Sequence, residues 1–339
     1  MELEFFLKKW ILLSLLVFTT PIFANQTVNG STFVFSEALM WQIREASATN
    51  WAQILTPTLA NQSILSLDVP FKWSPGLRIG AGFNGTEKPW NILFYYTGYK
   101  TRGTNQASTD TGELHSAFSS NFYANNPQGK GISGPYYHHA RIQWDVVFNT
   151  LDFELGRPIK VDKLVDLRPF LGLKAGMINQ SINSTWLNPS APTSQGSVLN
   201  PTFTSATEKI TNYFKGVGPS VGLDTAWHLY ATPTQTFNII GDFSGAFLWS
   251  NWTFDDVYQN NAPETISTAN DDISSSESML RAYLGIEWSS IISNANWTLR
   301  LGYEAQVWFN QLQYYSFVMG KTNDALYLQG AVLGFGVHF

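Results

Sequence analysis

Charged side chains recur inside segments that are otherwise rich in apolar residues, and they stand at alternate positions. Successive side chains of a strand point to opposite faces, so residues with this spacing gather on one face. Positive and negative members are balanced. The set could therefore form ion pairs, or select ions and polar solutes between opposed charges. Its members are Arg78, Arg141, Asp145, Asp166, Arg168, Lys174, Asp224, His228, Asp242, Arg281, Glu287, Arg300 and Glu304.

Asp224 and His228 lie four positions apart on one such face, and Ser220 shares it. A nucleophilic serine must lie within hydrogen-bond reach of its histidine. Residues four apart on a strand are about 13 Å apart along the backbone, so no triad can form within this strand. Nothing in the sequence shows a serine from a neighbouring strand. We therefore expect no catalytic residues and no enzymatic activity.

Three other histidines, His115, His138 and His139, fall in or beside one polar segment. Adjacent strand residues face opposite ways, so His138 and His139 do not chelate one ion while the strand continues. We expect neither a metal nor any other cofactor.

The elements that carry the charges are segments of strict alternation, as in a strand with two different faces. In one of them Leu299, Leu301 and Tyr303 alternate with Arg300 and Glu304. Such segments predict about ten strands, with counts of eight to twelve left open. They cover 33–44, 77–83, 90–99, 140–155, 165–177, 217–229, 237–249, 280–288, 297–309 and 325–339.

Two segments depart from this regularity. The apolar phase of 140–155 slips between Phe148 and Leu151, which predicts a bulge or an earlier end of the strand. Residues 45–74 could hold extra strands or a short helix.

The connections between predicted strands alternate between long and short. The long ones are rich in Asn, Ser, Thr and Gly, and cover 45–74, 101–138, 185–211, 253–278 and 312–324. The short ones lie around 84–89, 156–163, 231–235 and 291–296. Short periplasmic turns and long external loops are typical of an outer-membrane barrel. We therefore predict an all-β fold, a transmembrane antiparallel up-and-down β-barrel, over a soluble sandwich.

Both ends of the chain agree with export to the outer membrane. Residues 1–24 read as a signal peptide, because Lys8 and Lys9 precede an apolar run, 10–18, that is too short for the roughly 20 residues of a membrane-spanning helix. Residues 25–339 form the predicted barrel. The final strand places Phe335, Val337 and Phe339 in one apolar phase, and resembles the terminal signature that the barrel assembly machinery recognises.

Composition narrows the class of partner. The formal net charge is −5, and no basic patch suggests nucleic-acid binding. Charged residues make up 13% of the chain, about half the usual share in a soluble domain, while aromatic residues reach 15%. Aromatic girdles at two membrane interfaces would account for this balance. The expected partners are outer-membrane lipid and lipopolysaccharide.

Three short motifs, at 75–82, 152–157 and 167–174, resemble the Legionella major outer membrane protein family. The likeness extends from about residue 33 to Phe339. The resemblance implies a pore-forming outer-membrane protein without catalytic residues. Family members include cysteine-linked oligomers, but this chain has no cysteine, so any homo-oligomer must be non-covalent.

The leading hypothesis is a porin-like protein, integral to the outer membrane of a Gram-negative bacterium, that passes small solutes or ions through a narrow charged lumen. The alternative is a structural or host-contacting surface barrel, adhesin-like, whose lumen is plugged and whose long loops face outward. A third reading, a membrane-embedded hydrolase, needs a serine, histidine and acid cluster that the sequence does not display.

Overall fold

The computed structural model describes residues 30–57, 62–85, 90–110, 114–116, 136–190, 203–262, 265–292, 295–316 and 320–339. The predicted signal peptide lies outside these residues. Within them, no helix is long and apolar enough to cross a membrane.

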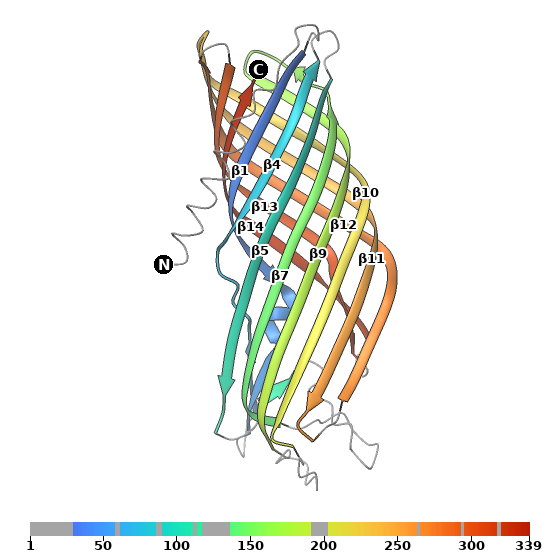
Figure 1. Ribbon diagram of the computed structural model, residues 1–339. Coiled ribbons are helices and arrows are strands. Elements are labelled where there is room, and N and C mark those ends of the chain that lie inside the picture. The colour runs from blue at the N-terminus through green and yellow to red at the C-terminus, as the bar shows by residue number, and fades with distance from the viewer. Residues whose placement is uncertain are drawn as a thin grey trace. The chain divides into compact units, whose positions relative to one another are not determined.

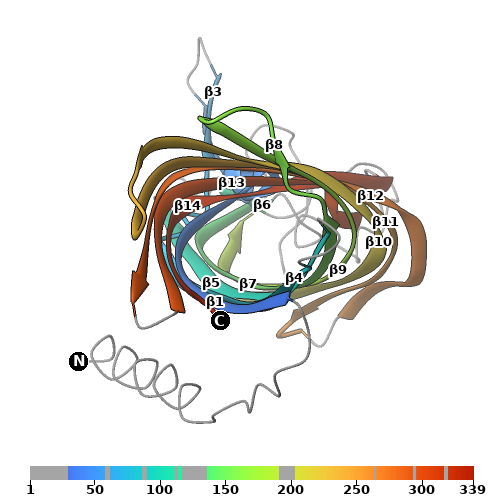
Figure 2. The same cartoon turned by 90° about the horizontal axis from the view of Figure 1, so that it is seen from above.

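An antiparallel ten-strand barrel makes up the fold (Figure 1). Its strands are β1 (Gly30–Glu45), β4 (Ser74–Gly85), β5 (Asn91–Ser108), β7 (Tyr136–Gly156), β9 (Val165–Ser190), β10 (Ser205–Ala231), β11 (Gln235–Asn260), β12 (Thr265–Ile292), β13 (Ala295–Ser316) and β14 (Gly320–His338). β1 pairs with β14, and β7 pairs with both β5 and β9, so the ring closes (Figure 2). The predicted fold class and strand count are confirmed.

Short elements decorate the ring. The 3-10 helix η2 (Ala46–Asn50), β2 (Ala52–Pro57) and β3 (Gln62–Leu67) fill the connection from β1 to β4, where extra strands or a short helix were foreseen. β6 (Leu114–Ser116) joins β2 to β7 in the sheet, and β8 (Ile159–Lys160) pairs with β9 at the other end. β3 and β8 lie outside the ring (Figure 2).

The strands are longer than predicted, and this corrects the external loops. The predicted loop 253–278 is in large part strand, because β11 continues into it and β12 begins within it. The predicted loops 101–138 and 185–211 begin and end in strand, because β5 and β9 continue into them and β7 and β10 begin within them. The residues at 117–135 and 191–202 lie outside the described residues.

The apolar stripe changes face along each long strand, which is why these extensions look like loops in the sequence. On β11, Phe247 and Trp249 point outward and are 49% and 67% exposed, as a lipid-facing surface requires. A few residues further on, Trp252, Phe254 and Tyr258 point inward and are buried. The outer face there is polar because water surrounds it, and the inner face is apolar because it forms a dry core.

The same reversal explains β7, where the predicted bulge is wrong. β7 keeps an unbroken register with β5 and β9, and every even-numbered residue from Ile142 to Gly156 is buried. Phe148 is the last large apolar side chain of the interior, and Leu151 is the first of the lipid-facing surface. The apolar phase therefore changes while the backbone stays regular.

Exposed aromatic rings mark the two edges of the lipid-facing belt. Trp90, Trp227 and Trp288 lie near the strand ends that also hold the carboxyl terminus, which we assign to the periplasm. Tyr213, Trp249, Phe309 and Tyr327 are their counterparts at the external edge.

The last strand only partly follows its predicted pattern. Leu333, Phe335 and Phe339 are exposed on the outer face. Val337 shares their phase but is only 2% exposed, so it does not present its side chain to lipid. The role of these residues in assembly stays a prediction.

Candidate functional site: the barrel lumen

The lumen has two chemically different halves. Its external half is filled by apolar and aromatic side chains, and its periplasmic half is lined by charged ones. The strands alternate in both halves, so the difference comes from which residue types the inward positions carry.

A continuous layer of aromatic rings crosses the lumen at the inner edge of the external half. Trp41 of β1 contacts Phe148 of β7, with ring centroids 6.3 Å apart, and Phe148 contacts Trp308 of β13 at 5.4 Å. Phe214 of β10 lies 6.2 Å from Trp308 and 5.1 Å from Trp252 of β11. All five residues are fully buried, and these centroid distances are those of rings in direct contact.

Some of the polar side chains inside this half form hydrogen bonds across the lumen. The Gln180 amide on β9 donates to the side-chain oxygen of Gln311 on β13 at 2.5 Å, and its own oxygen accepts from the Trp144 indole at 2.6 Å. Asn212 of β10 donates to the backbone carbonyl of Gln313 on β13 at 2.6 Å. These bonds tie opposite walls together and offset much of the cost of burying amides.

Further outward, a second group of rings extends the dry core. Trp51, which follows η2, lies 5.6 Å from Trp186 of β9, and Trp186 lies 5.3 Å from Tyr137 of β7. Tyr137 also contacts Phe203 at 6.5 Å. Through Trp51 the connection between β1 and β4 folds against the barrel interior.

The periplasmic half begins with a buried ion-pair network centred on Glu304 of β13. Arg78 of β4 donates both terminal nitrogens to Glu304, at 2.9 and 2.8 Å, and also contacts Glu37 of β1 at 2.7 Å. Arg281 of β12 reaches Glu304 at 3.2 Å and Asp242 of β11 at 3.3 Å. Burial of Arg78 and Glu304 is nearly complete, so the pairing compensates their lost hydration.

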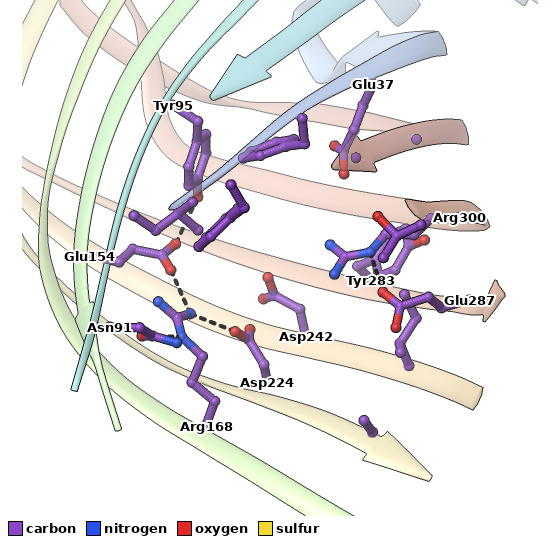
Figure 3. A pocket seen from close by; sticks show the side chains of 18 of the residues that line it. Glu37, Asn91, Tyr95, Glu154, Arg168, Asp224, Asp242, Tyr283, Glu287 and Arg300 are labelled. Carbon is purple, nitrogen blue, oxygen red and sulfur yellow. Dashed lines mark hydrogen bonds and ion pairs between the residues drawn. The ribbon is translucent and has the colours of Figure 1, made fainter. Parts of the chain in front are cut away.

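Tyr95 of β5 connects this network to a second cluster. Its hydroxyl donates to Glu154 of β7 at 3.0 Å and accepts from Arg281 at 3.0 Å. Arg168 of β9 then bridges Glu154 at 2.8 Å and Asp224 of β10 at 2.6 Å (Figure 3). Lys174 and Asp152 form a neighbouring buried pair.

The charges nearest the periplasm are less buried. Arg300 donates to Glu287 at 2.6 Å, and its side chain is 44% exposed. His228 contacts Asp166 through Nε2 at 3.0 Å and Asn238 through Nδ1 at 2.8 Å. Both ring nitrogens are thus engaged by residues other than Ser220.

These groups surround a cavity of about 320 Å³. It is bounded at the periplasmic rim by Phe33, Pro158 and His338, and reaches inward to Arg78 and Arg281. Figure 3 shows Asp242 between the Arg168 cluster and Arg300. The aromatic layer lies beyond the inner end, so the cavity is a vestibule on the periplasmic side.

Most of the predicted lumen charges face the lumen, but two do not. Arg141 is exposed on the outer face of β7, and Asp145 shares that face and pairs with Arg102 of β5 at 2.6 Å. The prediction failed because it assumed one polar face along the whole strand, whereas the inner face of β7 is apolar at that height. The lumen residues placed as predicted are Arg78, Asp166, Arg168, Lys174, Asp224, His228, Asp242, Arg281, Glu287, Arg300 and Glu304.

Three carboxylates of the periplasmic half, Glu37, Asp152 and Glu154, are missing from the predicted set, as are the buried Glu45, Glu208, Asp256 and Glu277 of the external half. Asp152 and Glu154 stand on the face of β7 opposite to Leu151, Phe153 and Leu155. The alternation of these three apolar residues indicates that the residues between them face the lumen. Glu37 gave no such signal because the faces of β1 are mixed.

Among the residues that the structure describes, no cluster of metal-ligating side chains occurs. His115 stacks on Tyr136 at 4.3 Å between ring centroids, and burial lowers the pKa of its imidazole.

A family model described as Legionella pneumophila major outer membrane protein precursor matches residues 32–339, which is almost the whole described barrel. The chain belongs to this family. Family membership and the closed barrel together make it an integral protein of the outer membrane. No curated protein sequence is significantly similar to this family member.

Solved structures with weak likeness to this family member are also outer-membrane proteins. The Escherichia coli outer membrane protease OmpT is 15% identical, with a TM-score of 0.39, and the match covers 95% of this chain and 99% of OmpT. The Pseudomonas putida toluene transporter TodX is 9% identical, with a TM-score of 0.30, over 92% and 91% of the two chains. At these scores the likeness carries no inference about activity.

Proposed function

We propose that this protein is a structural barrel of the outer membrane that holds a folded platform at the cell surface and does not conduct solutes in the conformation described. The contact between Phe148 and Trp308 carries this proposal. β5, β4, β1 and β14 separate their strands on one side of the ring, and β9, β10, β11 and β12 separate them on the other. The two rings therefore meet across the full width of the lumen.

The external half supports the platform role. Its strands continue beyond the lipid-facing belt with a polar outer face and a dry aromatic core, as in a water-soluble β-protein. η2, β2, β3 and β6 pack on the same end. A scaffold that presents surface segments needs this rigidity, whereas an open pore has no use for a filled interior.

The second candidate function is a porin-like pore that passes small solutes or ions, which is the function that the sequence favours. The charged vestibule favours it, because opposed rows of cations and carboxylates can select passing solutes. Conduction would then require the aromatic layer to move aside.

Conductance in planar bilayers separates the two candidates. We expect purified, folded protein to give no reproducible current steps, while a known porin reconstituted in the same way gives them. Reproducible steps from the wild-type barrel would overturn the scaffold proposal in favour of the pore. A Phe148→Ala, Trp308→Ala double variant asks whether the aromatic layer is the barrier, since it removes the ring contact that spans the lumen at this level.

A further inference from the structure

A cluster of cations stands on the outer face of the barrel at the external edge of the lipid-facing belt. Arg44 of β1, Lys72 just before β4, and Lys100 and Arg102 of β5 are all exposed. None of the four takes part in the lumen network.

Backbone and side-chain contacts bring these residues near one another although they come from separate elements. Phe71 bridges to Gly103 in antiparallel register, which sets Lys72 beside Arg102. Gln42 of β1 donates its amide to the Phe71 carbonyl at 2.7 Å, which brings β1 against this segment, and Arg44 lies two positions further toward the external end on the same face of β1. Lys100 lies two positions before Arg102 on the outer face of β5. We call these four residues the outer basic patch.

The charge of the outer basic patch is only partly compensated within the protein. Asp145 contacts the Arg102 Nε atom at 2.6 Å and also accepts from Gln143 at 2.7 Å. The Arg102 side chain remains 56% exposed beside this pair. Asp68 lies further from the membrane, beside Asn105.

The height of the outer basic patch matches the lipid headgroup region. Below it on β4 and β5, Ile79 and Phe94 are 46% and 51% exposed and belong to the lipid-facing belt. Trp73 is exposed within the patch, and Arg44 pairs in register with Tyr327 of the external aromatic girdle. Cations at this level meet the headgroups of the outer leaflet.

β10 also exposes two cations, Lys209 and Lys215, so what distinguishes the outer basic patch is that four cations of three segments lie together. Among the described side chains of β11 to β14, the only cations, Arg281 and Arg300, belong to the lumen. At the same height these strands expose uncharged side chains, among them Trp249, Ser276, Asn310 and Tyr327.

We propose that the outer basic patch binds the phosphate groups of a phosphorylated lipid of the outer leaflet, with the acyl chains lying on the apolar surface of β4 and β5. Arginine and lysine side chains match phosphate oxygens through charge-assisted hydrogen bonds. A bound lipid would contact the cations of the patch through its phosphates and the lipid-facing belt beneath through its acyl chains. A free phosphate ion would make only the first of these contacts. This proposal is independent of whether the lumen conducts.

Lipid A 1,4′-bisphosphate in detergent micelles is the probe, with binding followed by native mass spectrometry of the folded full-length barrel. We expect the Arg44→Gln, Lys72→Gln, Lys100→Gln, Arg102→Gln variant to bind at least about ten-fold more weakly than the wild type. The matched control is Lys160→Gln, Lys163→Gln, which removes exposed cations near the periplasmic end and should leave binding unchanged.

Two comparisons make the result decisive. Dephosphorylated lipid A should bind the wild type as weakly as bisphosphorylated lipid A binds the patch variant, and millimolar inorganic phosphate should not displace the lipid. Equal binding by wild type and patch variant, equal loss in the periplasmic control, or displacement by free phosphate would each overturn the proposal. A Lys72→Gln, Lys100→Gln variant, which keeps the Arg102 pair with Asp145, repeats the test with a smaller expected loss if the fourfold variant does not fold.

Discussion

Replacement of one buried carboxylate tests whether the lumen charges hold the barrel together. Glu304 is 1% exposed and accepts from Arg78 and Arg281. Glu304→Gln keeps the size and one acceptor oxygen of the side chain but removes the negative charge. Two guanidinium groups then remain close together in a buried site with less compensation.

The expected loss follows from how deeply the pair is buried. Removal of one partner of a buried ion pair costs about 3–5 kcal/mol, because the other charge stays desolvated. Glu37 still contacts Arg78 at 2.7 Å, and Asp242 still contacts Arg281 at 3.3 Å. These remaining partners place the loss for Glu304→Gln near the lower end, about 3 kcal/mol.

Glu287→Gln is the matched control. The substitution is chemically identical, but Glu287 pairs with Arg300, whose side chain is 44% exposed. Water solvates that arginine after the charge is lost, so the cost should stay at about 1 kcal/mol or less.

Urea unfolding of both variants in lipid vesicles, followed by tryptophan fluorescence, measures the two free energies of unfolding. The buried tryptophans of the external half report loss of the whole barrel. A Glu304→Gln barrel as stable as the Glu287→Gln barrel would refute the argument that the lumen network is a buried, mutually dependent set of charges.

Two further predictions concern the last strand. Deletion of Phe339, whose side chain is 67% exposed, should lower the fraction of folded barrel in the outer membrane. The free energy of unfolding should change by about 1 kcal/mol or less, because the residue contributes one hydrogen bond, to the Thr32 carbonyl. Normal insertion of the truncated chain would contradict the role of Phe339 in assembly. Gly330→Ala should cost about 1–3 kcal/mol in urea unfolding, because the new methyl group would lie 2.1 Å from the Met40 carbonyl oxygen of β1. Gly334→Ala should cost less, because its methyl group would meet side-chain atoms of Glu37 and Arg300, at 3.2 and 3.3 Å, and no backbone atom that close. Equal losses would count against this packing argument.

The membrane-spanning part of the fold could be predicted from the sequence because lipid imposes a simple rule there. Every outward residue must be apolar, so Leu299, Leu301 and Tyr303 identify their strand and place Arg300 and Glu304 in the lumen. The same rule placed Arg168, Arg281 and Asp242 correctly.

The external half could not be predicted in the same way, because the apolar residues of one strand face outward within the membrane and inward beyond it. Above the lipid, Arg141 and Asp145 are polar because they face water, while Trp144 fills the interior. Alternation alone does not say which face is inside. The residue at which the apolar phase changes contains that information, and on β7 it lies between Phe148 and Leu151.

Which lumen groups contact each other was also beyond the sequence. Glu304 lies far from Arg78 in the chain, and their contact depends on the closure of the ring through β1 and β14. The aromatic layer likewise depends on which inward-facing residues lie at the same level along the barrel axis. The stagger between neighbouring strands determines this level.

The exchange of apolar faces along the strands also fixes how deeply the barrel is immersed. A barrel with a uniformly apolar exterior could slide along the membrane normal at little cost. Here, sinking would bring the polar exterior around Arg141 and Asp145 into hydrocarbon, and rising would expose Phe247 and Leu173 to water. The change of phase therefore sets the depth at which the barrel sits in the membrane. The membrane surrounds the charged periplasmic half, and the aromatic external half lies outside it.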